Sequence, residues 1–259
     1  MIAGTFGLAI LPAILGWNIL HLAWSIPAAV LFFFMLLLPW SNRLHTMHLF
    51  DDWHVAARFA RLDQPVYGER IDTYVEALRQ ILSKPADEYL VTAHSLGGTL
   101  ATHVLGALID RYPGFLEGKA ISLVTLGGSG LQTSLLRCAT ALRQRIGTIL
   151  QSPVTWIDMQ CLTDPANFYR SKVARDNGFS ALPEPVVITI RVRNMLAPER
   201  YRRIKRDFLR VHRQFVLGSD RRTHFDYALL TAGPFGAPDF ARFSPANLPP
   251  LDQNGALVD

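Results

Sequence analysis

The strongest chemical signal in the chain is Ser95, in the segment 93–97 with the sequence Ala-His-Ser-Leu-Gly. Residues 89–93 form a short apolar, partly β-branched run, which is typical of a buried strand. Residues 97–109 have the spacing of a helix whose small residues face that strand. A serine on a strained turn between a strand and a helix needs small neighbours and is exposed for attack. The segment therefore predicts that Ser95 is a nucleophile, with an ordinary serine in a tight turn as the alternative.

A nucleophilic serine needs a general base, and the base needs a carboxylate that orients it. Asp164 follows the predicted strand 154–159 and stands on the loop just beyond its carboxyl end. That position suits the orienting acid, because the carboxyl ends of parallel strands meet at one edge of a sheet. Asp158, inside the same strand, is the competing carboxylate. We predict Asp164 as the acid, with a structural turn aspartate as the alternative.

Two of the eight histidines are candidates for the base. His224 lies in a polar loop that runs into the last predicted helix, after the acid in chain order, as a hydrolase triad requires. His212 lies within a basic helical segment, four residues after Phe208 and three before Phe215, which is typical of a packed helical histidine. We predict His224 as the base and keep His212 as the alternative. His94 precedes the serine, and we expect its side chain to point away from the base.

The oxyanion of an acyl-transfer reaction must be stabilised by hydrogen-bond donors. The backbone N–H of Leu96, directly after the serine, is one predicted donor. The second donor normally lies on a loop after an earlier strand, yet residues 41–87 contain no segment that reads as such a strand or loop. Two explanations are open: the sheet is truncated to its C-terminal strands and uses an unusual donor, or Met1 is not the true start of the ancestral domain. No cysteine or histidine pattern of a zinc site and no phosphate-binding loop is present, so we expect neither a metal nor an organic cofactor.

Strands that alternate with helices predict an α/β fold, with a mostly parallel sheet and flanking helices. We assign this domain to residues 41–239 and a loosely held, proline-rich tail to residues 240–259. The expected strands are 89–93, 120–126, 154–159 and 185–192, and the expected helices are 50–62, 69–82, 97–109, 131–150, 200–217 and one that begins near 226.

Residues 1–40 contain no Asp, Glu, Lys or Arg and predict a membrane anchor of one or two helices. Polar residues and tryptophans interrupt the run, which favours a hairpin with spans at about 2–16 and 24–39. A cleaved signal peptide is disfavoured, because no basic segment precedes the apolar run. Arg43, Arg58 and Arg61 follow the second span, so the positive-inside tendency places the domain on the cytoplasmic side of the inner (cytoplasmic) membrane.

The basic excess of the chain is local. The 259 residues carry a net charge of +5, whereas residues 191–222 alone hold ten arginines and one lysine against three carboxylates. Contact with anionic lipid headgroups and a merely solvated helix face are equally favoured explanations. Nucleic-acid binding is a weaker one, and we expect no nucleic-acid partner. The two cysteines do not form a disulfide framework.

Three segments together resemble a bacterial membrane-anchored α/β-hydrolase related to the class 3 (fungal-type) lipases. They are the turn at Ser95, here called the elbow, and the segments that contain Asp164 and His224. Ala93 replaces the first glycine of the Gly-x-Ser-x-Gly pattern of that family, and Gly97 keeps the second. Asp164, within Thr-Asp-Pro, is similar to the acid in the family's Asn-Asp-Pro-Val segment. His224, within His-Phe-Asp-Tyr, is similar to the family's His-x-x-Tyr ending. The resemblance covers about residues 89–234 and is strongest at the elbow.

The resemblance implies hydrolysis of carboxylic esters, lipids among them, by a triad of Ser95, Asp164 and His224 without a cofactor. The implied partners are an ester or lipid substrate and the membrane. A non-catalytic membrane protein that keeps the hydrolase scaffold as a binding or regulatory module is the alternative, motivated by the missing oxyanion strand. Acyl transfer to an acceptor other than water would use the same three residues.

Overall fold

The computed structural model describes residues 19–43, 45–128, 130–164, 166–252 and 257 of the chain. The chain divides into two compact units, Met1–Trp53 and His54–Asp259. The division lies within helix α4 (Thr46–Arg61), and therefore beyond the boundary at residue 40 that the end of the apolar run suggested.

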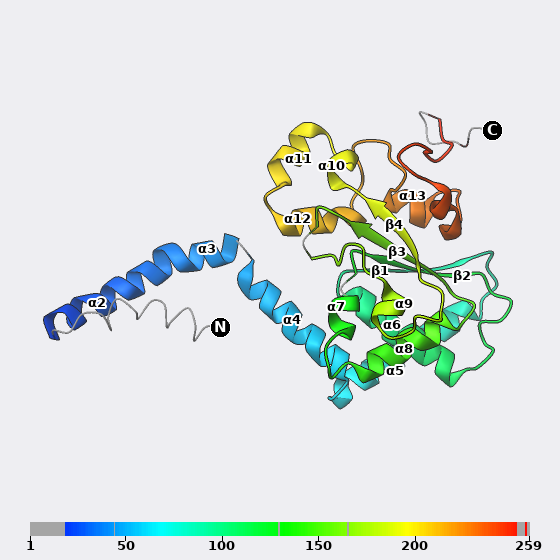
Figure 1. Cartoon of the computed structure of the whole chain (residues 1–259), viewed down its shortest axis with the longest axis horizontal. Helices are drawn as coiled ribbons and strands as arrows, with labels where there is room; N and C mark the ends of the chain where they lie inside the picture. Colours follow the sequence, from blue (N-terminus) through cyan, green and yellow to red (C-terminus); the bar gives the residue numbers. More distant parts are fainter. Residues whose placement is uncertain (1–18, 44, 129, 165, 253–256, 258–259) are drawn as a thin grey trace. The chain divides into compact units, whose positions relative to one another are not determined.

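The described part of the first unit is mainly one run of helix (Figure 1), formed by α2 (Ile19–Phe32), a π-helical segment (Phe33–Leu37) and α3 (Leu38–Arg43). Among the described residues, Ala23–Arg43 is the one helix that is long and apolar enough to cross a bilayer. The predicted span at 24–39 falls within it. The other predicted span, at 2–16, lies outside the described residues.

The second unit is built on a four-stranded parallel sheet in the order β1-β2-β3-β4. This architecture confirms the predicted parallel sheet with flanking helices. No described strand precedes β1, so β1 is an edge strand and is paired only with β2. The strands are β1 (Tyr89–His94), β2 (Ile121–Leu126), β3 (Thr155–Cys161) and β4 (Val186–Ile190).

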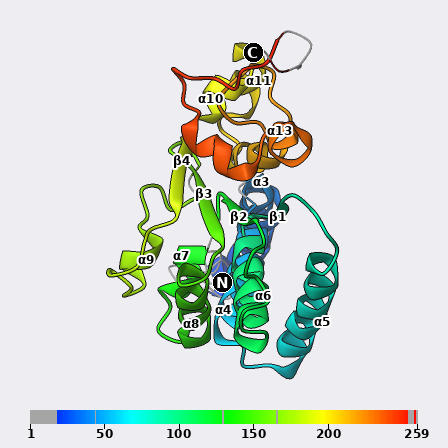
Figure 2. The same ribbon diagram turned by 90° about the vertical axis from the view of Figure 1, so that its right-hand side faces the viewer.

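One face of the sheet is covered by helices that precede or connect the strands (Figure 2). Leu123 of β2 and Trp156 of β3 pack on this face against apolar residues of the helices, including the fully buried Leu105 and Leu142. The helices on this side are α5 (Pro65–Leu82), α6 (Gly97–Arg111), α7 (Gly130–Ser134), α8 (Thr140–Leu150) and α9 (Val173–Asp176).

The opposite face is covered by the chain that follows β4. Leu126 of β2 and Met159 of β3 pack there against Phe215, Phe225 and Phe240, because side chains alternate between the two faces of a strand. The covering elements are α10 (Val192–Met195), α11 (Pro198–Ile204), α12 (Phe208–Arg213), α13 (Tyr227–Ala232) and the 3₁₀ segments Gln214–Val216 and Ala237–Arg242.

Two predicted helices are divided in the structure. The segment 131–150 forms α7 and α8, and the segment 200–217 forms α11, α12 and a 3₁₀ turn. Asp207 explains the second division, because its carboxylate accepts a hydrogen bond from the N–H of Arg210 and so begins a new helix. The expected loose tail is in part packed, since Phe240 and Pro249 are buried.

Helices α6 and α8 pack with almost no space between them at Gly106. A Cβ atom at this glycine would lie 2.7 Å from the Cβ and 3.0 Å from the Cα of Arg145 in α8. Gly68 in α5 is the opposite case, because a Cβ there would meet nothing within 4 Å.

We predict that Gly106→Ala lowers the free energy of unfolding by about 1–3 kcal/mol, because the two helices must separate. The matched change Gly68→Ala should raise it by about 0.5–1 kcal/mol, since alanine is the better helix residue and space is available. Urea unfolding of the detergent-solubilised chain, followed by tryptophan fluorescence, measures both. Equal effects of the two changes would contradict the close packing of α6 on α8.

His103 of α6 is fully buried, and its Nε2 atom lies 3.0 Å from the carbonyl oxygen of Phe59. Burial lowers the pKa of this imidazole from 6.5 to about 4. The unfolded chain therefore binds a proton between these pH values that the folded chain does not bind.

We predict that the free energy of unfolding falls as the pH is lowered from about 6.5 to about 4, by about 3 kcal/mol from this group. His103→Gln keeps an N–H donor for Phe59 but cannot titrate, so it should flatten this part of the stability profile. Unfolding curves at a series of pH values measure the slope. An unchanged slope in the variant would assign the pH dependence to other groups.

Candidate active site

Ser95 lies on the turn between β1 and α6 and has a φ angle of +55°. This left-handed conformation is uncommon for a residue other than glycine and costs on the order of 1 kcal/mol. The turn is fixed on both sides: the N–H of Ser95 donates to the carbonyl of Leu126, and the N–H of Gly98 donates to the carbonyl of Ser95. The predicted strand, strained turn and helix are therefore present, with a half-buried serine between them.

His212 and Asp164 form a buried pair. The Nδ1 atom of His212 lies 2.7 Å from Oδ2 of Asp164, and the two side chains are 7% and 0% exposed. An ionised carboxylate only accepts hydrogen bonds, so Nδ1 is the donor, and in the neutral imidazole this leaves the lone pair on Nε2. The Nε2 atom is buried and has no hydrogen-bond partner among the described residues. This is the tautomer that a general base needs.

Residues on both sides of the pair hold it in place. Oδ1 of Asp164 accepts from the N–H of Ala166, and the side chain of Asn167 donates to the carbonyl of Cys161 at the end of β3. His212 lies on the buried side of α12, next to the fully buried Phe215. The spacing of His212 from Phe208 and Phe215 predicted that His212 is packed in a helix. It did not predict the bond to the carboxylate of Asp164.

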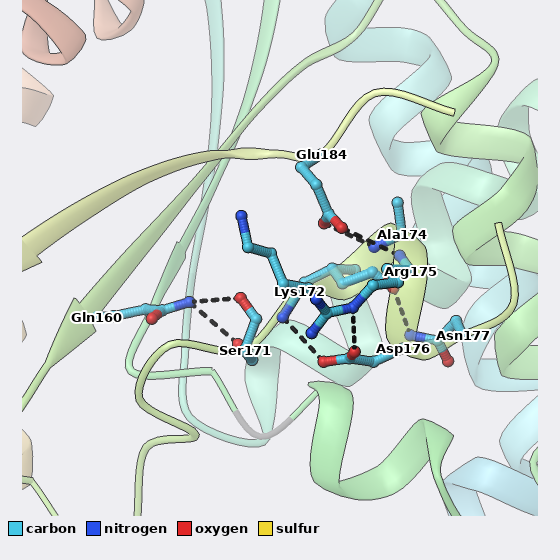
Figure 3. A network of polar contacts seen from close by, with 9 residues as sticks. Gln160, Ser171, Lys172, Ala174, Arg175, Asp176, Asn177 and Glu184 are labelled. Carbon is cyan, nitrogen blue, oxygen red and sulfur yellow. Dashed lines mark hydrogen bonds and ion pairs between the residues drawn. The ribbon is translucent and has the colours of Figure 1, made fainter. Parts of the chain in front are cut away.

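The far end of the Asp164 loop is anchored at Gln160 of β3 (Figure 3). The amide nitrogen of Gln160 donates to Oγ of Ser171, and its amide oxygen accepts from the N–H of Arg170. Beyond this point, the carboxylate of Glu184 accepts two backbone N–H groups of α9. The loop that carries Asp164 therefore leaves β3 and returns to it through fixed hydrogen bonds.

His94 points toward His212, in contrast to the expectation that it points away from the base. The centroids of the two rings are 4.5 Å apart, with an angle of 36° between the planes. The Nε2 atom of His94 also lies 3.0 Å from the carbonyl oxygen of His212. The end of β1, where the chain turns into Ser95, is thereby joined directly to His212.

His224 lies elsewhere. Its Nε2 atom is 3.0 Å from the carbonyl oxygen of Thr189 in β4, and burial lowers its pKa. The described residues give it no contact with Asp164, whose carboxylate is bonded to His212 instead. The structure therefore pairs Asp164 with His212 and not with the predicted His224.

Asp158 points to the face of the sheet that α5, α6 and α8 cover. Its two carboxyl oxygens accept hydrogen bonds from the hydroxyl of Thr125 and the amide of Gln160, both at 2.7 Å. Burial raises the pKa of this carboxyl group. Because β3 alternates its side chains, Asp158 shares a face with Trp156, whereas the neighbouring Ile157 and Met159 pack against the segment that carries His212. Its role is to support the sheet and Gln160.

The N–H of Leu96, the predicted oxyanion donor, has no acceptor among the hydrogen bonds of the described residues. It lies at the N-terminus of the 15-residue helix α6, where the helix dipole favours negative charge. The described residues contain no strand before β1 that could supply a second donor loop. They also contain no group of three or more potential metal ligands.

The geometry thus combines an N–H donor, a serine on a strained turn and a histidine–carboxylate pair tied to the residue before that serine, an arrangement suited to acyl transfer. Comparisons of the chain with known protein families, with curated proteins and with solved structures each gave no match. The function must therefore be argued from the site itself.

Proposed function

We propose that the chain is a membrane-anchored serine hydrolase of carboxylic esters, with Ser95 as nucleophile, His212 as general base and Asp164 as orienting acid. The observation that carries the proposal is the buried His212–Asp164 pair, whose imidazole packs on the residue that precedes a strained serine. The order serine, acid, histidine along the chain is that of the α/β-hydrolases.

The reaction has two steps. Oγ of Ser95 attacks the ester carbonyl while Nε2 of His212 takes its proton, and Asp164 stabilises the imidazolium that forms. The N–H of Leu96 donates to the developing oxyanion. The same proton passes to the leaving alcohol, and water then releases the acyl group with His212 again as base. Transfer to an acceptor other than water would differ only in this last step.

The apolar helix Ala23–Arg43 supports attachment to a membrane, because Ala29 is its one buried residue and a water-facing helix of this composition would be unfavourable. Arg43, Arg58 and Arg61 follow its apolar part and favour a cytoplasmic catalytic unit at the inner membrane.

The basic segment, residues 191–222, supports the proposal that the substrate is a lipid ester. Four of its exposed cations, Arg203, Lys205, Arg206 and Arg213, have no carboxylate within ion-pair distance among the described residues, whereas Arg200, Arg202 and Arg210 are paired. Arg213 directly follows the proposed base. We propose that this surface contacts anionic lipid headgroups, with about 1 kcal/mol from each cation.

A non-catalytic binding or regulatory module on the same scaffold is the competing function. The observation in its favour is that β1 is an edge strand, so the usual source of the second oxyanion donor is absent from the described residues. Reactivity of the serine decides between the two functions.

We predict that a fluorophosphonate probe labels the full chain in membranes and that Ser95→Ala abolishes labelling. His212→Asn keeps an N–H for Asp164 but loses the base, and should slow labelling by about 10²–10⁴-fold. The matched change His224→Gln should leave the rate unchanged, because its amide still donates to Thr189. Loss with His224→Gln alone would restore His224 as the base, and an unlabelled wild type would favour the non-catalytic module.

The same labelling assay distinguishes the roles of Asp164 and Asp158. Asp164→Asn should slow labelling by about 10⁴-fold, because an amide stabilises the wrong tautomer of His212. Asp158→Asn keeps the size of the side chain at a position bonded to Thr125 and Gln160 and not to His212, so it should label at nearly the wild-type rate. Equal losses in the two variants would contradict the separate roles of these residues.

We predict that vesicles containing phosphatidylglycerol protect the full chain from trypsin at Arg203 to Arg206, whereas pure phosphatidylcholine vesicles do not. The double change Arg203→Glu and Arg206→Glu should remove protection of the remaining basic sites. Arg70→Glu with Lys84→Glu changes the charge equally at exposed positions outside this segment and should have no effect. Protection by RNA but not by anionic vesicles would instead identify a nucleic-acid surface.

A further inference from the structure

His94 makes two different contacts with one residue. Its ring stacks on the ring of His212 at 4.5 Å between centroids, and its Nε2 atom lies 3.0 Å from the backbone carbonyl oxygen of His212. A carbonyl only accepts, so Nε2 of His94 carries the hydrogen. The stacking restricts the orientation of the base, and the hydrogen bond restricts the position of its backbone.

A third ring closes this cluster. The ring of Phe215 lies 6.0 Å from that of His94 and 6.3 Å from that of His212, and Phe215 is fully buried. Gly127 provides the space, because a Cβ there would lie 2.5 Å from Cε2 of Phe215. Its φ angle of +54° also favours glycine. The cluster is therefore packed against the backbone that follows β2.

We propose that His94 is the positioning residue of the catalytic base. It joins the end of β1, which leads into the nucleophile, to His212 and so fixes the distance between Ser95 and His212. This inference rests on the proposed function of Ser95. His94 and Ser95 are consecutive residues, so a base held by His94 is held relative to the nucleophile. The contact joins residues that are far apart in the sequence, because His94 and His212 are 118 positions apart. A displacement of about 1 Å in such a pair can cost about 10²-fold in rate.

Charge supports this arrangement. Burial, followed by the proximity of His212, lowers the pKa of His94. The hydrogen bond to the carbonyl of His212 and the charge of Asp164 oppose this lowering of the pKa, whereas Arg213 adds to it. A neutral His94 keeps its N–H for the carbonyl and adds no positive charge beside His212 when that residue accepts the serine proton.

The test is the rate of fluorophosphonate labelling per folded molecule, in membranes that contain the full chain. In this reaction Oγ of Ser95 bonds to phosphorus, fluoride leaves with the P–F electron pair, and the hydroxyl proton passes to His212. His94→Ala removes both contacts and should lower the maximal labelling rate by about 10²-fold, with little change in the probe concentration for half-maximal rate.

Two further variants separate the contacts. His94→Gln keeps an N–H at the position of Nε2, and His94→Phe keeps a ring on His212; each should recover part of the rate lost in His94→Ala. His103→Gln is the matched control, because His103 makes the same kind of bond to a backbone carbonyl at 3.0 Å but lies among the helices of the other face. It should label at the wild-type rate.

The outcomes are distinguishable. A His94→Ala protein that labels at the wild-type rate per folded molecule, even with less protein folded, would overturn the positioning role and leave the proposed function intact. The same conclusion follows if only the half-maximal concentration changes. An unlabelled wild type would overturn both proposals.

Discussion

The structure depends on one property of a parallel sheet built in sequence order: the connections between its strands all lie on one face. Here α6, α8 and α9 follow β1, β2 and β3 in turn and pack on the same side. The opposite face would expose Leu126, Met159 and Ile190 to water unless the chain after β4 covered it. That segment consists of short helices with several buried phenylalanines, and it contains His212. The packing that covers this face of the sheet therefore also places His212 beside Asp164.

The same alternation of side chains separates two carboxylates that arise from one strand. Asp158, inside β3, points among the helices, where a hydroxyl and an amide satisfy it and burial raises its pKa. Asp164 lies beyond the strand and meets an imidazole that can become positively charged. Burial is similar in the two cases, yet the partners differ. Two neutral groups bond to Asp158, whereas an imidazole, which can take up a proton, bonds to Asp164.

The sequence predicted the strands, the turn at Ser95 and the position of Asp164 on the loop after β3 because these features are local. Apolar runs report buried strands, and small residues around Ser95 report a tight turn. It favoured His224 over His212, although both follow Asp164 in the chain, and the structure pairs Asp164 with His212 instead. Which of them meets Asp164 depends on how α12 packs against the sheet. The direction of His94 was unpredictable for the same reason, because its partner is supplied by a remote segment. The division at Asp207, in contrast, follows from a local cap that could have been predicted.

The separation between His94 and His212 also has a consequence in time. Chains are synthesised at about 5–20 residues per second, and domains fold as their residues emerge. The 118 positions between the two histidines then correspond to about 6–24 s of synthesis. A nascent chain carries the serine throughout this interval but lacks His212, the proposed base. On the proposed mechanism and membrane attachment, the ribosome-bound protein does not react with lipid esters until the segment after β4 has packed on the sheet.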